Sequence, residues 1–120
     1  MVWSCLVSIL PGMAQTEKLT DYVNPFVGTD GYGNVYPGAQ IPFGGIQISP
    51  DTDSRFYDAA SGYKYNHLTL MGFSLTHLSG TGIPDLGDFL FIPGTGEMKL
   101  EPGTHEDPDQ GYRSRYSHDK

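Results

Sequence analysis

Residues 68–78 read LTLMGFSLTHL, and this run decides the fold class of the 120-residue chain. A turn-like stretch, GTGIP at residues 80–84, follows it closely. Short runs that are bounded by glycine and proline in this way are typical of β-strands. After Tyr22, no stretch of roughly 11 or more residues keeps apolar positions at helical spacing without an interrupting glycine or proline. The sequence therefore predicts an all-β chain.

Further strand-like runs are spread along the chain. They cover residues 41–49, where Ile46 and Ile48 alternate with Gln47, and residues 61–65, 89–92 and 112–118. A sandwich needs about seven strands, whereas this chain offers about five. We therefore expect a partial antiparallel β-sandwich, with more chain to follow. Its inner face would lack a partner sheet, so the chain alone should aggregate or stay partly folded; that face would carry Ile46, Ile48, Phe73, Phe89 and Phe91.

The composition and charge exclude several classes of partner. The chain carries 14 acidic and 7 basic residues, for a formal net charge of −7, and no segment concentrates lysine or arginine. Affinity for nucleic acid or for an anionic membrane surface comes from clustered cations, so we expect neither as a partner. With 38% hydrophobic and 12% aromatic residues, the chain is also too apolar to be disordered.

The N-terminus is typical of a protein for export. Residues 1–10 read MVWSCLVSIL, an uncharged apolar run, and the small residues Gly12 and Ala14 follow. A bilayer span needs about 20 apolar residues, but a shorter run before small residues fits a secretory signal. The lack of a basic residue near the start leaves a plain apolar N-terminus as the alternative. The signal would contain Cys5, which is the only cysteine, so we expect no disulfide in the mature chain.

These features predict a simple domain organisation. Residues 1–14 would be the signal peptide, residues 15–21 a linker, and residues 22–120 the incomplete N-terminal β-sandwich domain of a larger protein. We expect a periplasmic or extracellular protein with no membrane span.

A glycine-rich stretch at residues 28–33, GTDGYG, superficially resembles a phosphate-binding loop. Such loops open onto a helix N-terminus, whose free N–H groups face the anion. Here residues 34–38, NVYPG, do not start a helix, and the glycines are in the wrong order for a dinucleotide site. We therefore expect a tight turn with positive φ angles, which is also compatible with the lining of a polar pocket.

Residues 51–55, DTDSR, begin like a calcium-binding EF-hand loop. Arg55 and the missing glutamate at the twelfth place exclude that interpretation. The expected structure is instead a turn, over residues 50–54, in which the carboxylates of Asp51 and Asp53 bond to nearby backbone N–H groups.

Residues 72–76 nearly form the nucleophile elbow of a serine hydrolase around Ser74. Thr76 stands where the second glycine is required, and the strand-to-helix context is missing. A hydrolase with His77 as its base is therefore only a fallback hypothesis. Because the flexible loop 79–82 follows, His77 is interpreted either as a hydrogen-bonded structural residue or as a residue that faces a ligand.

Two other sets of polar residues carry no predicted chemistry. Asp85 and Asp88 would point to opposite faces of an extended strand, so we expect them to cap a turn or to bond to the preceding Ser/Thr loop, and not to form an acid–base pair. The other histidines lack metal-ligand spacing with each other or with a cysteine, so zinc is not expected; they are His67, His105 and His118.

Several motifs together carry a family resemblance. In order and spacing, residues 22 to about 93 resemble the N-terminal region of glycoside hydrolase family 92. The motifs are YVNPFVGT at residues 22–29, YPGA at 36–39, IPFG at 41–44, QISPDT at 47–52, SGYKY at 61–65, GFSLTHLSGTG at 72–82 and DLGD at 85–88.

The resemblance implies a calcium-dependent exo-α-mannosidase that inverts the anomeric configuration. It also implies that the β-sandwich packs on a large helical barrel, with the active site in the cleft between the two. The family's catalytic carboxylates and most of its calcium ligands lie in the helical domain, which would follow Lys120. We therefore expect no catalytic and no metal-binding residue in this chain, and no hydrolysis by the chain alone.

What the resemblance implies for this chain is one wall of the mannose site. Phe26 would be an apolar contact to the sugar, and the backbone of the stretch before Ser61 would contact hydroxyl groups. The family commonly has Gly-Cys where this sequence has Ala59 and Ala60, so a thiol contact is lost here. Ile83 stands in the loop that recognises the leaving sugar, often with an aromatic residue, and this leaves the linkage preference open. The implied substrate-binding residues are Phe26, Ala59, Ala60, Ser61, His77 and Ile83.

An alternative function belongs to a different class. The chain could be a stand-alone carbohydrate-binding β-sandwich without catalysis. The partner is a mannose-containing glycan in both cases, but a self-contained lectin binds mannose alone, whereas half a cleft should bind it hardly at all.

Overall fold

The computed structural model describes residues 17–53, 57–80, 82–84 and 87–118. Within these ranges the chain is all-β, as predicted, and its helical segments are short 3₁₀ turns. They are η1 (Leu19–Tyr22), η2 (Tyr57–Ala59) and η3 (Pro108–Gln110). The predicted signal peptide and Asp85 lie outside the described residues.

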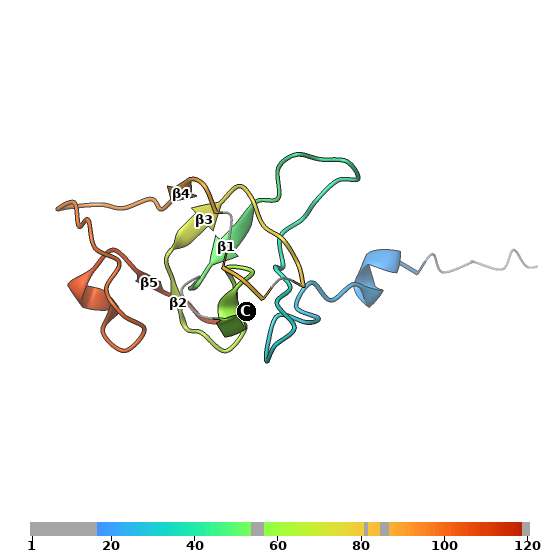
Figure 1. Ribbon diagram of the computed structural model, residues 1–120, viewed down its shortest axis with the longest axis horizontal. Coiled ribbons are helices and arrows are strands. Elements are labelled where there is room, and N and C mark those ends of the chain that lie inside the picture. The colour runs from blue at the N-terminus through green and yellow to red at the C-terminus, as the bar shows by residue number, and fades with distance from the viewer. Residues whose placement is uncertain (1–16, 54–56, 81, 85–86, 119–120) are drawn as a thin grey trace, which may run out of the picture.

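The strands form two small antiparallel sheets (Figure 1). In the first, β3 (Gly72–Ser74) lies between β1 (Ser49–Asp51) and β4 (Leu90–Phe91). In the second, β2 (Thr69–Leu70) pairs with β5 (Ser114–Arg115). The 3₁₀ turn η1 lies well away from both sheets (Figure 1), with Leu19 and Tyr22 exposed.

The run that decides the fold class contains two strands where the sequence predicts one. β2 and β3 are separated by Met71, whose N–H donates to the Asp51 carbonyl oxygen at 2.7 Å. The chain therefore passes from one sheet to the other within a single residue. Strands also form inside two other predicted runs, as β4 within residues 89–92 and β5 within residues 112–118.

The predictions for residues 41–49 and 61–65 are largely wrong. Residues 41–44 form a turn, in which the Gly44 N–H donates to the Ile41 carbonyl at 2.9 Å, and only Ser49 belongs to a strand. Phe43 has a positive φ of 63°, which lies outside the extended region, so the strand cannot run through this turn. Residues 61–65 lie in turns and irregular backbone. The predicted turn over residues 50–54 is also wrong at its start, because Pro50 and Asp51 pair with β3.

The first sheet has a polar face and an apolar face. Phe73 of β3 pairs with both Pro50 and Phe91, so these side chains share one face. Phe73 and Phe91 are 38% and 58% exposed. On the opposite face, Asp51 and Ser74 are buried. The buried part of this sheet is therefore polar, and its apolar face is left open.

Candidate functional site

His77 lies at the centre of the buried polar face. Its Nε2 atom is 3.0 Å from Asp51 Oδ1 and 3.1 Å from Ser74 Oγ, and its Nδ1 atom is 2.6 Å from the Gln47 carbonyl oxygen. Gly62 lies directly beside this group, with a positive φ of 93°, and a Cβ there would collide with Asp51 Oδ1. Glycine is therefore required at this position.

This geometry argues against the fallback serine hydrolase. In a catalytic triad, the serine and the carboxylate bond to opposite nitrogens of the imidazole. Here both contact Nε2, and Nδ1 donates to a backbone carbonyl. Burial on its own lowers the pKa of His77, but the hydrogen bonds to Asp51 and to the Gln47 carbonyl outweigh it, so the pKa is raised. An imidazolium that donates from both nitrogens cannot take a proton from Ser74.

A cavity of about 200 Å³ opens beside His77. Two buried oxygens in its lining residues, Asp51 Oδ2 and Ser61 Oγ, have no hydrogen-bond partner among the residues that the structure describes. A buried carboxylate oxygen without a donor is costly, so a ligand or water with O–H groups would stabilise it. At roughly 30 Å³ per water, the cavity has room for several waters or for one small polyhydroxylated ring.

The cavity brings together three of the predicted substrate-binding residues. Ala60, Ser61 and His77 line it, and Ala59 is fully buried next to them. The Ala60 N–H is already engaged with Asn34 Oδ1 at 3.0 Å, and the Ala59 carbonyl accepts from the Gly62 N–H at 2.9 Å. Both nitrogens of His77 are also engaged, so His77 would act on a ligand by holding Asp51 in place.

Phe26 does not line this cavity. It lies in an aromatic cluster, with ring centroids 5.3 Å from Tyr65, 5.4 Å from His118 and 6.2 Å from Tyr63. Tyr65 and His118 are stacked at 4.1 Å. The remaining predicted residue, Ile83, is exposed on the loop after His77.

The sequence reasoning missed Asn34, which connects three loops. Its side-chain oxygen accepts the Ala60 N–H at 3.0 Å, and its backbone carbonyl accepts the Gly80 N–H at 2.7 Å. Asn34 is buried and has a positive φ of 49°, a conformation that asparagine tolerates better than most residues. In the sequence, the position of Asn34 directly after the glycine-rich loop could have indicated this role. That loop is the predicted tight turn, with positive φ at Gly28 and Gly31.

A second buried polar cluster surrounds Asp53. Asp53 Oδ2 lies 3.3 Å from Arg113 and 3.1 Å from His105 Nε2, and the Asp53 and Arg113 side chains are fully buried. For Asp51 the predicted bond to a nearby backbone N–H is wrong, because this carboxylate bonds instead to His77, which lies 26 residues further along the chain. The buried Asp53 carboxylate also has partners from distant parts of the chain, His105 and Arg113.

The described residues contain no group of three or more histidine, cysteine, aspartate or glutamate side chains that could hold a metal ion. The His67 and His105 rings lie 4.1 Å apart beside Asp53. Burial and the positive charge of His105 lower the pKa of His67. Burial and the positive charge of Arg113 lower the pKa of His105. These residues do not fit a calcium site.

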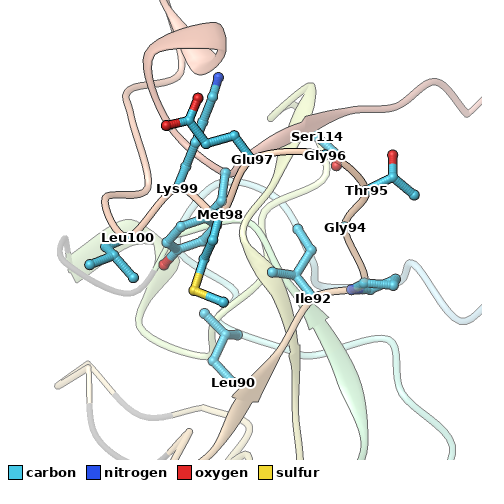
Figure 2. A pocket seen from close by; sticks show the side chains of 13 residues that line it. Leu90, Ile92, Gly94, Thr95, Gly96, Glu97, Met98, Lys99, Leu100 and Ser114 are labelled. Atoms are coloured by element: carbon cyan, nitrogen blue, oxygen red, sulfur yellow. The ribbon is translucent and has the colours of Figure 1, made fainter.

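A larger hollow, of about 940 Å³, lies between β4 and the 94–100 loop (Figure 2). Leu90, Ile92, Met98 and Leu100 give it a mainly apolar lining. No predicted site residue lines it. Among the helical segments that the structure describes, none has the length and apolar character needed to cross a membrane.

The structure is thus a small all-β domain with a polar cavity, and comparison with known protein families identifies its class. The sequence model of the glycosyl hydrolase family 92 N-terminal domain matches residues 22–120. The chain therefore belongs to glycosyl hydrolase family 92.

A protein of the fungus Arthroderma benhamiae, described as an uncharacterized secreted glycosidase, is 36% identical over 73 residues. The match covers 60% of this chain but only 9% of that protein. The chain thus corresponds to a small part of this relative.

Proposed function

We propose that this chain is the N-terminal, sugar-contacting part of an exported exo-α-mannosidase. Family membership and the secreted relative support a glycosidase that leaves the cell. The polar cavity is the observation that carries the sugar-contacting role, because Asp51 Oδ2 and Ser61 Oγ need O–H donors there. A mannose ring presents several hydroxyl groups and no charge, which suits a chain with a net charge of −7.

The role of these residues is to bind and orient, not to break the glycosidic bond. The Asp51 carboxylate would accept a sugar hydroxyl, while the imidazolium of His77 holds its other oxygen. Ser61 would add a second hydrogen bond to the sugar. The acid and base carboxylates would come from a helical domain elsewhere in the full-length protein, and so would the calcium ligands.

Binding of methyl α-mannoside to the full-length gene product tests this role. The Ser61→Ala variant removes one hydrogen bond, which is worth about 1 kcal/mol, so the dissociation constant should rise roughly five-fold. Ser79→Ala, on the exposed loop after His77, is the matched control and should leave binding unchanged.

Two results would contradict the proposal. A wild-type gene product that neither binds methyl α-mannoside nor releases mannose from α-linked mannobiose would remove the assigned activity. Tight mannose binding by the 120-residue chain alone, without hydrolysis by any longer product, would favour the stand-alone carbohydrate-binding module.

A further inference from the structure

The imidazole of His77 lies between two oxygens that can only accept hydrogen bonds. Its Nδ1 atom is 2.6 Å from the Gln47 carbonyl oxygen, and its Nε2 atom is 3.0 Å from the carboxylate oxygen Asp51 Oδ1. A neutral imidazole carries a single N–H, so it can donate to one of these oxygens and must turn a lone pair toward the other. An imidazolium donates to both. The observed arrangement is therefore complete only when His77 is protonated.

The aromatic ring of Tyr36 lies against the same imidazole. The two ring centroids are 5.1 Å apart, and the ring planes are tilted by 34°. Within about 6 Å of the ring centre, the negative charge on an aromatic face attracts a cation, and more strongly where water is excluded. His77 is buried, and the Tyr36 hydroxyl is engaged elsewhere, with Gln40 Oε1 at 2.6 Å. The Tyr36 ring therefore favours the protonated form of His77.

The surroundings of His77 act in the same direction. Burial on its own would lower the pKa of His77, but the bonds to Asp51 and to the Gln47 carbonyl outweigh burial and raise the pKa. Among the described groups that face the imidazole, Asp51 alone is charged, and its charge is opposite to that of an imidazolium. These groups are Asp51 of β1, Ser74 of β3, the Gln47 carbonyl, the Tyr36 ring and the backbone of Gly62.

The protonation of His77 determines how Asp51 faces the cavity. Both residues line the cavity, and Asp51 Oδ2 lacks a hydrogen-bond partner within the described ranges. With His77 protonated, a charge-assisted hydrogen bond fixes Oδ1 and leaves Oδ2 to accept from a ligand. With His77 neutral and its one N–H kept for the Gln47 carbonyl, the Nε2 lone pair faces the carboxylate. That repulsion removes the force that holds Asp51 in place.

We propose that the cavity takes its neutral, hydroxyl-bearing ligand only while His77 is an imidazolium, and that Tyr36 is a positioning residue that keeps His77 in this state. The inference deepens the proposed function and rests on it. Ligand affinity should be fully present at low pH and be lost as the pH rises through the folded-state pKa of His77. Tyr36 acts through His77 and Asp51 and need not touch the ligand.

The test is the pH dependence of methyl α-mannoside binding to the full-length gene product, measured by isothermal titration calorimetry. From about pH 6 to about pH 9, the wild-type dissociation constant should rise about ten-fold, because a charge-assisted hydrogen bond is lost. Tyr36→Leu removes the aromatic face, so the midpoint of this rise should move to a pH lower by about 0.7. Groups elsewhere in the protein titrate in both, so the difference between the curves isolates Tyr36.

Three further variants isolate the ring and the proton. Tyr36→Phe keeps the ring and loses only the bond to Gln40, so it should follow the wild-type curve. Tyr22→Leu removes an exposed tyrosine from η1, which lies away from both sheets (Figure 1), and should do the same. His77→Gln does not titrate, so it should abolish the rise, and Tyr36→Leu added to it should move no midpoint. Thermal melting at each pH checks that the variants are folded.

The possible results separate this inference from the function on which it rests. If the wild type binds equally well at every pH, the imidazolium is not required: the inference is wrong and the mannose site stands. If Tyr36→Leu weakens binding by one factor at every pH, or Tyr36→Phe behaves like Tyr36→Leu, the positioning role is wrong. If Tyr36→Leu does not fold, His77→Gln decides, because a wild-type pH profile in that variant overturns the inference. If the wild type binds at no pH, the proposed function itself fails, and this inference fails with it.

Discussion

The two faces of the β1-β3-β4 sheet are opposite in character to those of a typical domain. One face, with Asp51, Ser74 and His77, is polar and buried, and its groups bond to one another. The other face, with Phe73 and Phe91, is apolar and open. An antiparallel sheet usually buries its apolar face and leaves its polar face in water.

The difference between the two faces shows how each of them is stabilised. The polar face is already covered by this chain's own loops, whose hydrogen bonds hold it together. The apolar face can gain its stabilisation only from something that is not among the described residues. Among the described residues few apolar side chains are buried, and they include Ala59, Ala60, Tyr63 and Pro108. Stability of these residues therefore depends strongly on buried polar contacts, and variants can test each face separately.

The largest effect should follow from the loss of Arg113. Its guanidinium donates to the Thr52 carbonyl at 2.6 Å and to Asp53 at 3.3 Å, and both side chains of the ion pair are fully buried. Arg113→Met leaves the Asp53 carboxylate buried without its cation, which should cost about 3–5 kcal/mol of unfolding free energy. Urea denaturation followed by tyrosine fluorescence measures the loss.

Arg115 provides the matched control for Arg113. It lies two positions along the chain, and its pair with Asp109 is exposed, with the closest atoms 3.6 Å apart. Arg115→Met should change stability by less than about 1 kcal/mol. Equal losses in the two variants would show that the buried polar cluster does not stabilise the fold.

An intermediate effect should appear in the pH dependence of stability, with opposite signs in the two polar clusters. The pKa of His77 is raised in the folded state, so its contribution is fully present below about pH 6.5 and is lost as the pH rises through the folded pKa. The pKa of His105 is lowered, so the unfolded state gains protons first and stability falls as the pH drops below about 6.5.

Glutamine variants of the two histidines test these opposite pH dependences of stability. Relative to wild type, His77→Gln should lose most stability near pH 5.5 and least near pH 8.5. His105→Gln should show the reverse order, with its greatest loss at the higher pH. Urea midpoints at several pH values give both comparisons. Parallel pH profiles for the two variants would contradict the opposite protonation preferences of the clusters.

Local sequence predicted the all-β class because turn residues mark the ends of its strands. Residues 89–92 and 112–118 contain β4 and β5, and the glycine-rich loop has its predicted positive φ angles. The prediction failed where long-range partners decide the outcome. Asp53 is buried because His105 and Arg113, 52 and 60 residues further along, fold back onto it. No local pattern around Asp53 contains that information.

The candidate site was predictable only in part for the same reason. The resemblance selected Ala60, Ser61 and His77, and the fold brings these residues to one cavity. It could not select Asp51, whose unpartnered oxygen gives the cavity its polarity, because a carboxylate in a turn-like motif is usually a cap. Asn34 was missed because its role depends on loops that meet only in the folded chain.

The smallest effect on stability, and the sharpest test of the comparison, concerns the apolar face. Replacement of both Phe73 and Phe91 by threonine keeps strand propensity and removes the exposed rings. In the 120-residue chain we expect less self-association, measured by sedimentation velocity, for a loss of about 1 kcal/mol or less in stability. Phe43→Thr is the control, because Phe43 is fully exposed in a turn outside the sheets.

In the full-length protein, where a partner would cover this face, the double variant should instead cost about 2 kcal/mol or more. Equal losses in the two contexts would mean that the apolar face stays open there too, and that the contrast between the faces does not reflect a missing partner.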